Sequence, residues 1–410
     1  MSGVGVDQNA LGGMTMGDLK TRYVEAAVRE DLPAKMVFLG GPRQVGKTTL
    51  AQMIAESAKA AVYLNWDHRP HRQAILGAKW PPETDFLVFD EVHKYARWKS
   101  LIKGIWDTRA RHQQILVTGS SRLDVFRRGG DSLLGRYHYF RLHPFSLREL
   151  SGSKPPATAF PKAAPELALD APGAGLDDLL RLGGFPEPLL AGSERTLKRW
   201  QHGRFERVFR EDIRATEVVR ELSQVELLGA LMPGRVGSPL SLRSLTEDVE
   251  VSPVTLKTWV ELLSRNYYVF KVPPYHRRLE RALKKEAKYY LWDWSEVEDR
   301  GVRFENLVGS HLLKFSHWFE DVFGLRVELY YVRDREKREV DFLMVWEGRP
   351  WFLVECKLQA DRTFTHLQYF GKKLGVDRLY HVTLEGEDDY LDRSSGVRVV
   401  PASKFLMALV

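Results

Sequence analysis

The sequence contains very little cysteine. Among its 410 residues Cys356 is the only one, which excludes an intrachain disulfide framework and a zinc site built on several thiolates. Long apolar runs are also missing, because no stretch of about 18 apolar residues occurs. Residues 1–19 lack the basic start and apolar core of a secretory signal. These absences predict a cytoplasmic protein with no membrane segment.

The composition is that of an ordinary globular protein. Hydrophobic residues make up 44% of the chain and charged residues 28%, which excludes wholesale disorder. A chain of this length is expected to divide into two or three domains. The formal charge of +7 favours a polyanionic partner such as DNA, although a lysine-rich surface that serves solubility alone gives the same balance.

Short apolar runs alternate with amphipathic stretches from residue 30 to residue 150. Each run ends in polar or glycine residues, as in KMVFLGG, FLVFDE and QILVTGSS. Alternation of strands and helices is typical of a parallel, doubly wound α/β sheet. We therefore predict one α/β domain over residues 30–150, preceded by a flexible or helical leader over residues 1–29.

The rest of the chain changes character three times. Residues 151–176 are rich in Pro, Ala and Gly and predict a linker or long loop. Residues 177–222 have the periodicity of a helical, lid-like segment. Residues 223–298 read as helix, turn, helix and strand pair, the order of a winged helix-turn-helix with its recognition helix at Thr255 to Leu263. Residues 299–410 predict a second α/β domain with a mixed sheet.

A glycine-rich loop stands between the first predicted strand and the helix after it. Its sequence fits G-x-x-x-x-G-K-[ST], and this context is the one that a phosphate-binding loop requires. Backbone N–H groups of the loop would face phosphate oxygens, Lys47 would neutralise the β and γ phosphates, and Thr48 would ligate magnesium. The predicted ATP-binding residues of the loop are Gly41, Pro42, Arg43, Gln44, Val45, Gly46, Lys47, Thr48 and Thr49.

Two carboxylates end a later apolar strand, where ligands of parallel sheets bind. We expect Asp90 to hold the magnesium ion of ATP and Glu91 to polarise the attacking water. The strand that follows ends in hydroxyl residues, of which Thr118 or Ser120 would sense the γ phosphate. Arg136 is a candidate for an arginine supplied to a neighbouring subunit's site, although a surface arginine is the commoner outcome.

The segments GGPRQVGKTTL, FLVFDEVHK, VTGSS, LLGRYHYFRLHPFSLREL and GGFPEPLL occur in this order. From about residue 20 to its end, the chain resembles the bacterial and archaeal AAA+-type ATPases that carry a C-terminal restriction-endonuclease-like domain. The resemblance implies an ATPase core, a winged-helix middle and a nuclease-fold tail, in a protein that self-associates into a ring or other homo-oligomer.

The C-terminal region carries a second set of charged residues. A three-residue loop would pair Trp346 with Pro350, which puts Asp341 opposite Glu355 on one face of a hairpin. Such an acid pair suits Mg²⁺ or Mn²⁺. Lys357 on that face would position water, and Glu305 on the preceding helix would complete the metal shell.

This set is similar to the PD-(D/E)xK nuclease motif, except that Val340 stands where the motif has proline. The resemblance implies catalytic roles for these residues in metal-dependent DNA cleavage. Two alternatives remain open at this stage: the charges are structural, or the nuclease fold grips DNA without cutting it.

Basic residues gather around the predicted wing and would neutralise DNA phosphates. The predicted DNA-binding residues are Arg277, Arg278, Arg281, Lys284 and Lys285, with Lys271 and Lys288 in the same row. A basic row that is only a solvated face, or one that binds a protein, would have the same sequence pattern. The hypothesis that joins these observations is an ATP-hydrolysing protein that remodels or processes DNA, and its rival is an ATP-switched assembly on DNA or protein with a non-cutting clamp.

Overall fold

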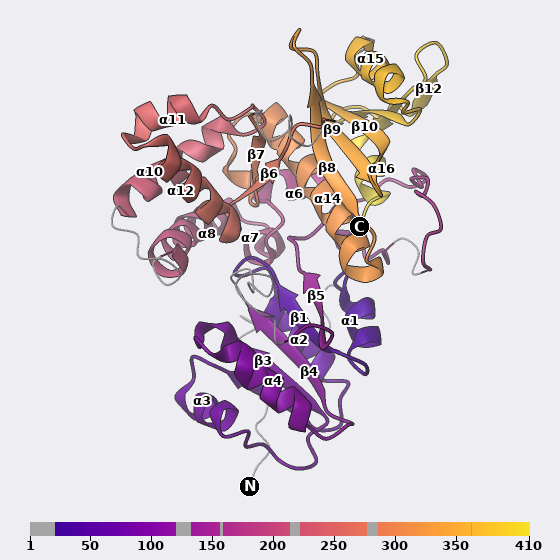
Figure 1. The fold of residues 1–410 in the computed structure, drawn as a ribbon. Helices are drawn as coiled ribbons and strands as arrows, with labels where there is room; N and C mark the ends of the chain where they lie inside the picture. Colours follow the sequence, from indigo (N-terminus) through magenta and orange to yellow (C-terminus); the bar gives the residue numbers. More distant parts are fainter. Residues whose placement is uncertain (1–20, 120–132, 156–158, 214–221, 277–285, 362) are drawn as a thin grey trace. The chain divides into compact units, whose positions relative to one another are not determined.

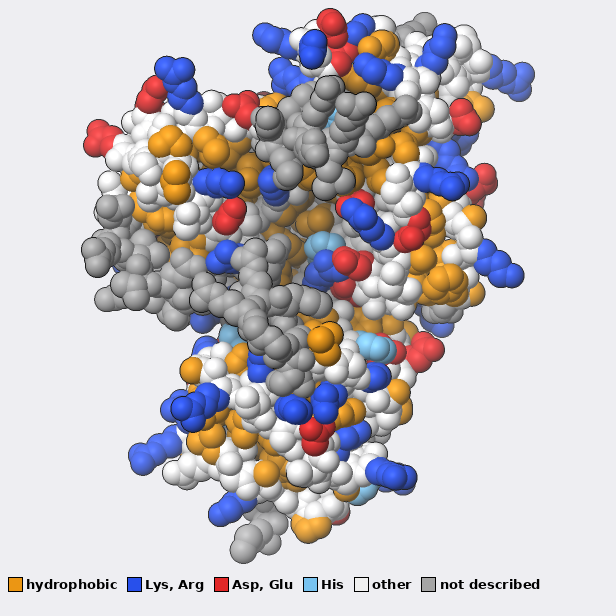
Figure 2. All heavy atoms as spheres, in the orientation of Figure 1, with side chains coloured by type: hydrophobic (Ala, Val, Ile, Leu, Met, Phe, Trp, Pro, Cys, Tyr) orange, Lys and Arg blue, Asp and Glu red, His pale blue; other side chains and the backbone are white. Residues whose placement is uncertain are grey.

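The computed structural model describes residues 21–119, 133–155, 159–213, 222–276, 286–361 and 363–410. These residues form two compact units, residues 1–143 and residues 144–410 (Figure 1). Within the described part of the chain, no helix has both the length and the apolar character needed to span a bilayer. Figure 2 shows acidic and basic side chains interspersed over the visible face of each unit.

The first unit is built on a five-stranded sheet in which all neighbouring strands are parallel. Its strands are β1 (Met36–Gly40), β2 (Ala61–Asn65), β3 (Phe86–Asp90), β4 (Gln114–Gly119) and β5 (Tyr137–Arg141), in the order β2-β3-β4-β1-β5. All residues of β1 and β3 are buried, as expected for central strands covered on both faces. The predicted parallel α/β sheet is confirmed.

Helices pack on this sheet through apolar faces. They are α1 (Glu25–Asp31), α2 (Lys47–Ala55), α3 (Arg69–Leu76), the short helix η3 (Val92–Lys94) and α4 (Trp98–Thr108). In α4, Trp98, Ile102 and Ile105 recur at helical spacing and enter the core. The end of the predicted leader is folded: Tyr23 is buried and its hydroxyl donates to the Arg141 carbonyl.

The second unit begins at Pro144, six positions before residue 150, the predicted end of the α/β domain. Its first helix, α5 (Leu147–Leu150), is packed within this unit. Glu149 of α5 forms a buried ion pair with Lys314. The apolar pattern of this segment gave no sign of its partner, since the pair joins residues 165 positions apart.

A largely helical region follows. Its helices are α6 (Leu176–Leu182), α7 (Pro186–Ala191), α8 (Glu194–Glu206), the π-helical turn η4 (Arg207–Ile213), α10 (Leu222–Leu231), η5 (Met232–Arg235), α11 (Leu242–Val249) and α12 (Pro253–Arg265). The α12 helix begins where expected, because Ser252 caps it by accepting from the Thr255 N–H and proline occupies its first turn.

Strands β6 (Val269–Val272) and β7 (Lys288–Leu291) pair antiparallel directly after α12. Helices α11 and α12 and this strand pair follow one another in the predicted order, and a winged helix-turn-helix stays a prediction. The aromatic residues Tyr267, Tyr268 and Phe270 are buried, so they belong to the core and not to a base-stacking surface.

The C-terminal region packs helices on a six-stranded mixed sheet, as predicted. The strands are β8 (Val327–Arg333), β9 (Glu339–Trp346), β10 (Arg349–Lys357), β11 (Leu379–Thr383), β12 (Tyr390–Asp392) and β13 (Val397–Pro401), in the order β12-β13-β11-β10-β9-β8. The helical elements are η6 (Trp294–Glu296), α14 (Arg300–Phe323), α15 (Thr365–Leu374) and α16 (Ala402–Met407).

The predicted loop between β9 and β10 is wrong by one residue. Trp346 pairs with Arg349 and not with Pro350. The loop has two residues, Glu347 at φ 48° and Gly348 at φ 77°, a conformation that suits the twist of a hairpin. An irregularity between Pro350 and Phe352 then shifts the register by one residue, so the strands beyond it keep the predicted alignment.

Candidate active site

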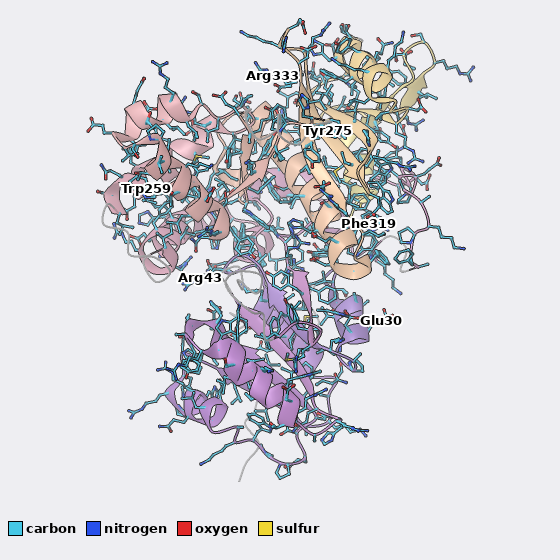
Figure 3. The ribbon with its side chains drawn as sticks, in the orientation of Figure 1. Glu30, Arg43, Trp259, Tyr275, Phe319 and Arg333 are labelled. Carbon is cyan, nitrogen blue, oxygen red and sulfur yellow. The ribbon has the colours of Figure 1, made fainter. Side chains whose placement is uncertain are left out.

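The loop between β1 and α2 has the backbone shape of a phosphate cradle. Gly41, Gln44 and Gly46 all have positive φ, at 150°, 60° and 96°. A side chain on Gly41 would collide with the Leu142 carbonyl oxygen, so glycine is required there on two grounds. The segment therefore folds as its glycine spacing predicts. Figure 3 labels Arg43 within this loop.

Lys47 is the first residue of α2 and is buried. Its ammonium group donates to the carbonyl oxygens of Gly41 and Pro42, at 2.9 and 2.7 Å. These bonds hold the charge within the loop, at the positive N-terminal end of a helix, where anions are stabilised. A fixed cation and an oriented helix end together form a site for phosphate.

Asp90 is buried at the carboxyl end of β3 and accepts from four side chains. The Thr48 hydroxyl and the Asn65 amide donate to its Oδ2 atom at 3.3 and 3.2 Å. The Tyr63 hydroxyl donates to the same oxygen, and the Thr118 hydroxyl donates to Oδ1. These donors fix the carboxylate beside the phosphate loop, with Thr48 as the direct link between the two.

Sequence reasoning missed Tyr63 and Asn65. Both lie on β2 and point toward Asp90 of the neighbouring strand β3. Burial, and then the charge of Asp90, raise the pKa of Tyr63, so this hydroxyl stays a donor. The available signal was that Tyr63 and Asn65 are two positions apart at the end of an apolar strand. This spacing places both side chains on the same face of the sheet.

Glu91 leaves β3 in a left-handed conformation, with φ 57°. Its N–H donates to the Thr118 carbonyl at 3.1 Å. Its carboxylate lies 3.6 Å from the Lys94 ammonium and 3.7 Å from Nε2 of His93. Burial lowers the pKa of His93 despite the nearby carboxylates. Positive φ is rare for a residue other than glycine and tends to occur at functional sites.

Arg22 is a buried arginine that donates a hydrogen bond to the phosphate loop, and sequence reasoning did not predict this role. Arg22 donates to the Val45 carbonyl at 2.7 Å and also to the His143 carbonyl. It lies in the predicted leader, where no motif marked it. The loop is thus tied to the segment that follows β5.

Arg136, also predicted to act at an ATP site, lies away from this one. Arg136 lies at the start of β5, where its carbonyl accepts from Met36 at the first residue of β1. This is the amino end of the sheet, opposite the phosphate loop, and Arg136 pairs there with Asp107 at 2.8 Å. Its role toward a neighbouring subunit stays a prediction. Ser120 lies outside the described residues.

The predicted C-terminal residues lie on neighbouring elements. Asp341 of β9 accepts from the N–H of Cys356 on β10 at 2.8 Å. Glu355 lies 3.2 Å from Lys357, and burial raises the pKa of Glu355. These contacts bring Asp341, Glu355 and Lys357 to one region of the hairpin, as the sequence predicts.

Glu305 of α14 contacts Lys288, a residue that the sequence predicted to lie in the basic row around the wing. Its Oε1 atom accepts from Lys288 at 3.1 Å and from the Tyr290 hydroxyl at 2.6 Å. Burial and the charge of Asp341 raise the pKa of Glu305 to about 7. Lys288 is buried and does not belong to a surface row of basic residues, which corrects that expectation. In the described ranges, no three His, Cys, Asp or Glu side chains are arranged to hold a metal ion.

The predicted DNA-binding residues Arg277, Arg278, Arg281, Lys284 and Lys285 lie outside the described part of the chain. Lys271, from the same row, is exposed on β6. Contact with DNA through this region stays a prediction.

Comparisons with known proteins divide the chain into three matched regions. Residues 33–151 match the AAA domain family, residues 173–295 a domain of unknown function (DUF8612), and residues 300–405 another (DUF4143). An uncharacterized protein of Methanocaldococcus jannaschii is 22% identical over 380 residues, covering 86% of this chain and 82% of that protein.

An uncharacterized protein of Mycobacterium tuberculosis is 21% identical over 344 residues, covering 81% of this chain and 73% of that protein. Among solved structures, a Walker-type ATPase of Pyrococcus abyssi aligns with a TM-score of 0.42 at 15% identity, over 70% of this chain and 97% of that one. The residues that are similar to the AAA domain family, 33–151, contain both the phosphate loop and its partner Asp90.

Proposed function

We propose that the chain binds ATP with Mg²⁺ and hydrolyses it. The observation that carries this proposal is the junction of the phosphate loop with Asp90, where Thr48 and three residues of β2 and β4 fix one buried carboxylate. A strand end that served only the fold would not need four donors on one side chain. The donors orient the carboxylate for a ligand at the edge of the sheet.

Each residue of the site has a distinct role in this proposal. The loop N–H groups and Lys47 bind the phosphates, and Thr48 and Asp90 hold the metal ion directly or through water. A magnesium ion held by Thr48 and Asp90 would supply positive charge against the negative charge of the phosphates. Glu91, one residue beyond Asp90, orients water and accepts its proton, while its contacts with Lys94 and His93 define its position.

Replacement of Lys47 tests the binding half of the proposal. Lys47→Ala should lose most ATP affinity, because the loop keeps its shape-determining glycines but loses its fixed counter-charge. Lys59→Ala, an exposed lysine of the same unit, is the control. Equal binding of a fluorescent ATP analogue by Lys47→Ala and the parent would remove the site assignment.

We further propose that DNA is the partner on which the ATPase acts. The net charge of +7 and the helix-turn-helix order support a polyanionic ligand. Replacing Arg277, Arg278, Lys284 and Lys285 together with Ala should weaken DNA binding across sequences and reduce its salt dependence. Unchanged affinity and salt dependence would favour the rival, a protein partner.

For the C-terminal region we propose a non-cutting clamp. The specific observation in its favour is that the Lys288 ammonium lies 3.1 Å from Glu305 and 3.9 Å from Asp341, among the carboxylates that a metal would need. Metal-dependent cleavage through Asp341, Glu355 and Lys357 is the competing function. Incubation of linear, branched and single-stranded DNA with Mg²⁺ or Mn²⁺, with and without ATP, separates the two, because cleavage lost in Asp341→Ala would establish the competitor.

A further inference from the structure

Lys288 is a buried lysine, and lysine is rarely buried in proteins. It begins β7 and only 1% of its side chain is exposed. A buried ammonium is stable only when carboxylates or other acceptors compensate its lost hydration. The Tyr331 ring also faces it, with its centroid 5.5 Å from the Nζ atom, which favours a cation there.

Three carboxylates surround this ammonium. Its Nζ atom lies 2.7 Å from Glu339, 3.1 Å from Glu305 and 3.9 Å from Asp341. These groups come from α14 and β9, so one side chain of β7 links three elements. The nearby carboxylates raise the pKa of Lys288 against the effect of burial, in agreement with a charged ammonium.

The same carboxylates are the ones that a nuclease-like metal site would use, so their fit to a divalent metal can be tested on the structure. Oε1 of Glu305 already accepts from Tyr290 and Lys288, and Oδ2 of Asp341 accepts from the Cys356 N–H. Each of these two carboxylates thus has one oxygen that accepts from protein donors. The Lys288 ammonium lies 2.7 to 3.9 Å from Glu339, Glu305 and Asp341, where a divalent ion shared by these carboxylates would have to bind, so the arrangement does not fit Mg²⁺ or Mn²⁺ while the lysine is in place.

Local structure keeps Lys288 in this position. Its backbone pairs with Val272 of β6 and with Pro239. These pairings fix the backbone from which the side chain extends. A metal in place of the ammonium would leave the buried lysine without its carboxylate acceptors.

We propose that the Lys288 ammonium is the resident cation of the carboxylates Glu305, Glu339 and Asp341. It occupies the electrostatic role of a divalent metal and fastens the β6–β7 pair to α14 and β9. The C-terminal unit consequently takes no Mg²⁺ or Mn²⁺ at these residues. This inference rests on the geometry of the second unit and is independent of ATP hydrolysis by the first.

A manganese titration of the full-length protein without nucleotide tests the proposal. Bound Mn²⁺ is counted by the loss of the free-ion electron paramagnetic resonance signal, for the parent and for Asp341→Asn. The two proteins should bind equal amounts of Mn²⁺. An additional ion in the parent that disappears in Asp341→Asn would overturn the proposal.

Removal of the lysine provides the second arm. In Lys288→Met the carboxylates lose their cation, so Mn²⁺ should raise the thermal unfolding midpoint of this variant by several degrees and leave the parent unchanged. Lys314→Met is the matched control, because Lys314 is a buried lysine that pairs with Glu149, away from the three carboxylates, and this variant should show no response to Mn²⁺. A Lys288→Met protein that ignores Mn²⁺ would contradict the assigned role.

A charge-balanced variant guards against failure to fold. Lys288→Met combined with Glu339→Gln removes one ammonium and one carboxylate, which preserves the formal charge of the cluster. This protein should fold and keep a Mn²⁺-dependent rise in midpoint through Glu305 and Asp341. If Mn²⁺ has no effect on it, the three carboxylates do not act as a cation site and the proposal is wrong.

Discussion

The hydrogen bonds on Asp90 show how single residues prepare this site. Tyr63, the donor from the middle of β2, is less acidic than an ordinary tyrosine, because burial and Asp90 raise its pKa. A tyrosine hydroxyl in this position cannot serve as a base near neutral pH. Its contribution is to orient the carboxylate that adjoins Thr48 and the phosphate loop.

Tyr63→Phe tests this positioning role. Loss of one hydrogen bond to a charged group amounts to about 1.5–3 kcal/mol, so the Mg²⁺ concentration required for half-maximal ATPase activity should rise at least several-fold while the affinity for ATP without metal stays near that of the parent. Tyr95→Phe is the control, since its ring stacks on Trp66 instead. An unchanged Mg²⁺ requirement would show that Asp90 does not need this donor.

His311 is a second residue whose chemistry is fixed by its surroundings. Its Nε2 atom accepts from the Leu147 N–H at 3.1 Å, and Nδ1 lies 2.8 Å from the Leu307 carbonyl, which requires the neutral ring with its proton on Nδ1. Burial lowers the pKa of His311 to about 4. The folded state therefore binds fewer protons than the unfolded state between pH 6.5 and pH 4.

The resulting stability is fully present above pH 6.5 and is lost as the pH falls toward 4. Over that range roughly 3 kcal/mol should disappear from the free energy of unfolding. His311→Gln should be less stable at pH 7 and should lose less stability on acidification, whereas exposed His202→Gln should keep the parent slope. Denaturant unfolding at a series of pH values measures this, and parallel curves for His311→Gln and the parent would refute the assignment.

At the scale of elements, α5 is anchored to α14 by charge as well as by packing. Glu149 closes a capping box with Ser146 and pairs with Lys314, which also donates to the Pro144 carbonyl at 3.0 Å. Both members of the pair are buried. This anchor explains why residues from Pro144 onward belong to the second unit.

Glu149→Gln should therefore destabilise the second unit strongly. An unpaired buried ammonium costs about 3–5 kcal/mol. The comparison variant is Glu194→Gln, which breaks an exposed pair with Arg181 and should change stability by less than about 1 kcal/mol. Urea unfolding followed by tryptophan fluorescence compares them, and similar small effects would mean that α5 is held by apolar contacts alone.

Sequence patterns predicted the elements better than the partners of charged residues. The parallel sheet follows from buried apolar runs, and the phosphate loop follows from glycine spacing, both of which are local signals. The predicted length of the β9–β10 loop was wrong because the turn contains only Glu347 and Gly348. A later irregularity restores the predicted alignment of the two strands. Lys288 was placed on a surface because it ends a basic run, and nothing local shows that Glu305 and Glu339 enclose it.

At the scale of the whole molecule, a unit that carries the proposed ATP site is followed along the chain by a second unit in which Lys288 lies among three carboxylates. Self-association is the remaining proposal at this scale, with Arg136 as a candidate arginine for a neighbouring subunit's site. Arg136 pairs with Asp107 at the amino end of the sheet, so its guanidinium charge is not at the ATP site of its own chain. ATP turnover is the property on which the other proposals depend.

Phosphate release at saturating ATP and Mg²⁺ tests this central claim most directly. Glu91→Gln should bind ATP as the parent does and lose turnover by at least about 100-fold, because general-base catalysis contributes factors of this size. Exposed Glu83→Gln, in the same unit, should behave as the parent. If Glu91→Gln and Lys47→Ala both release phosphate at the parent rate, hydrolysis does not occur at this site and the account is wrong.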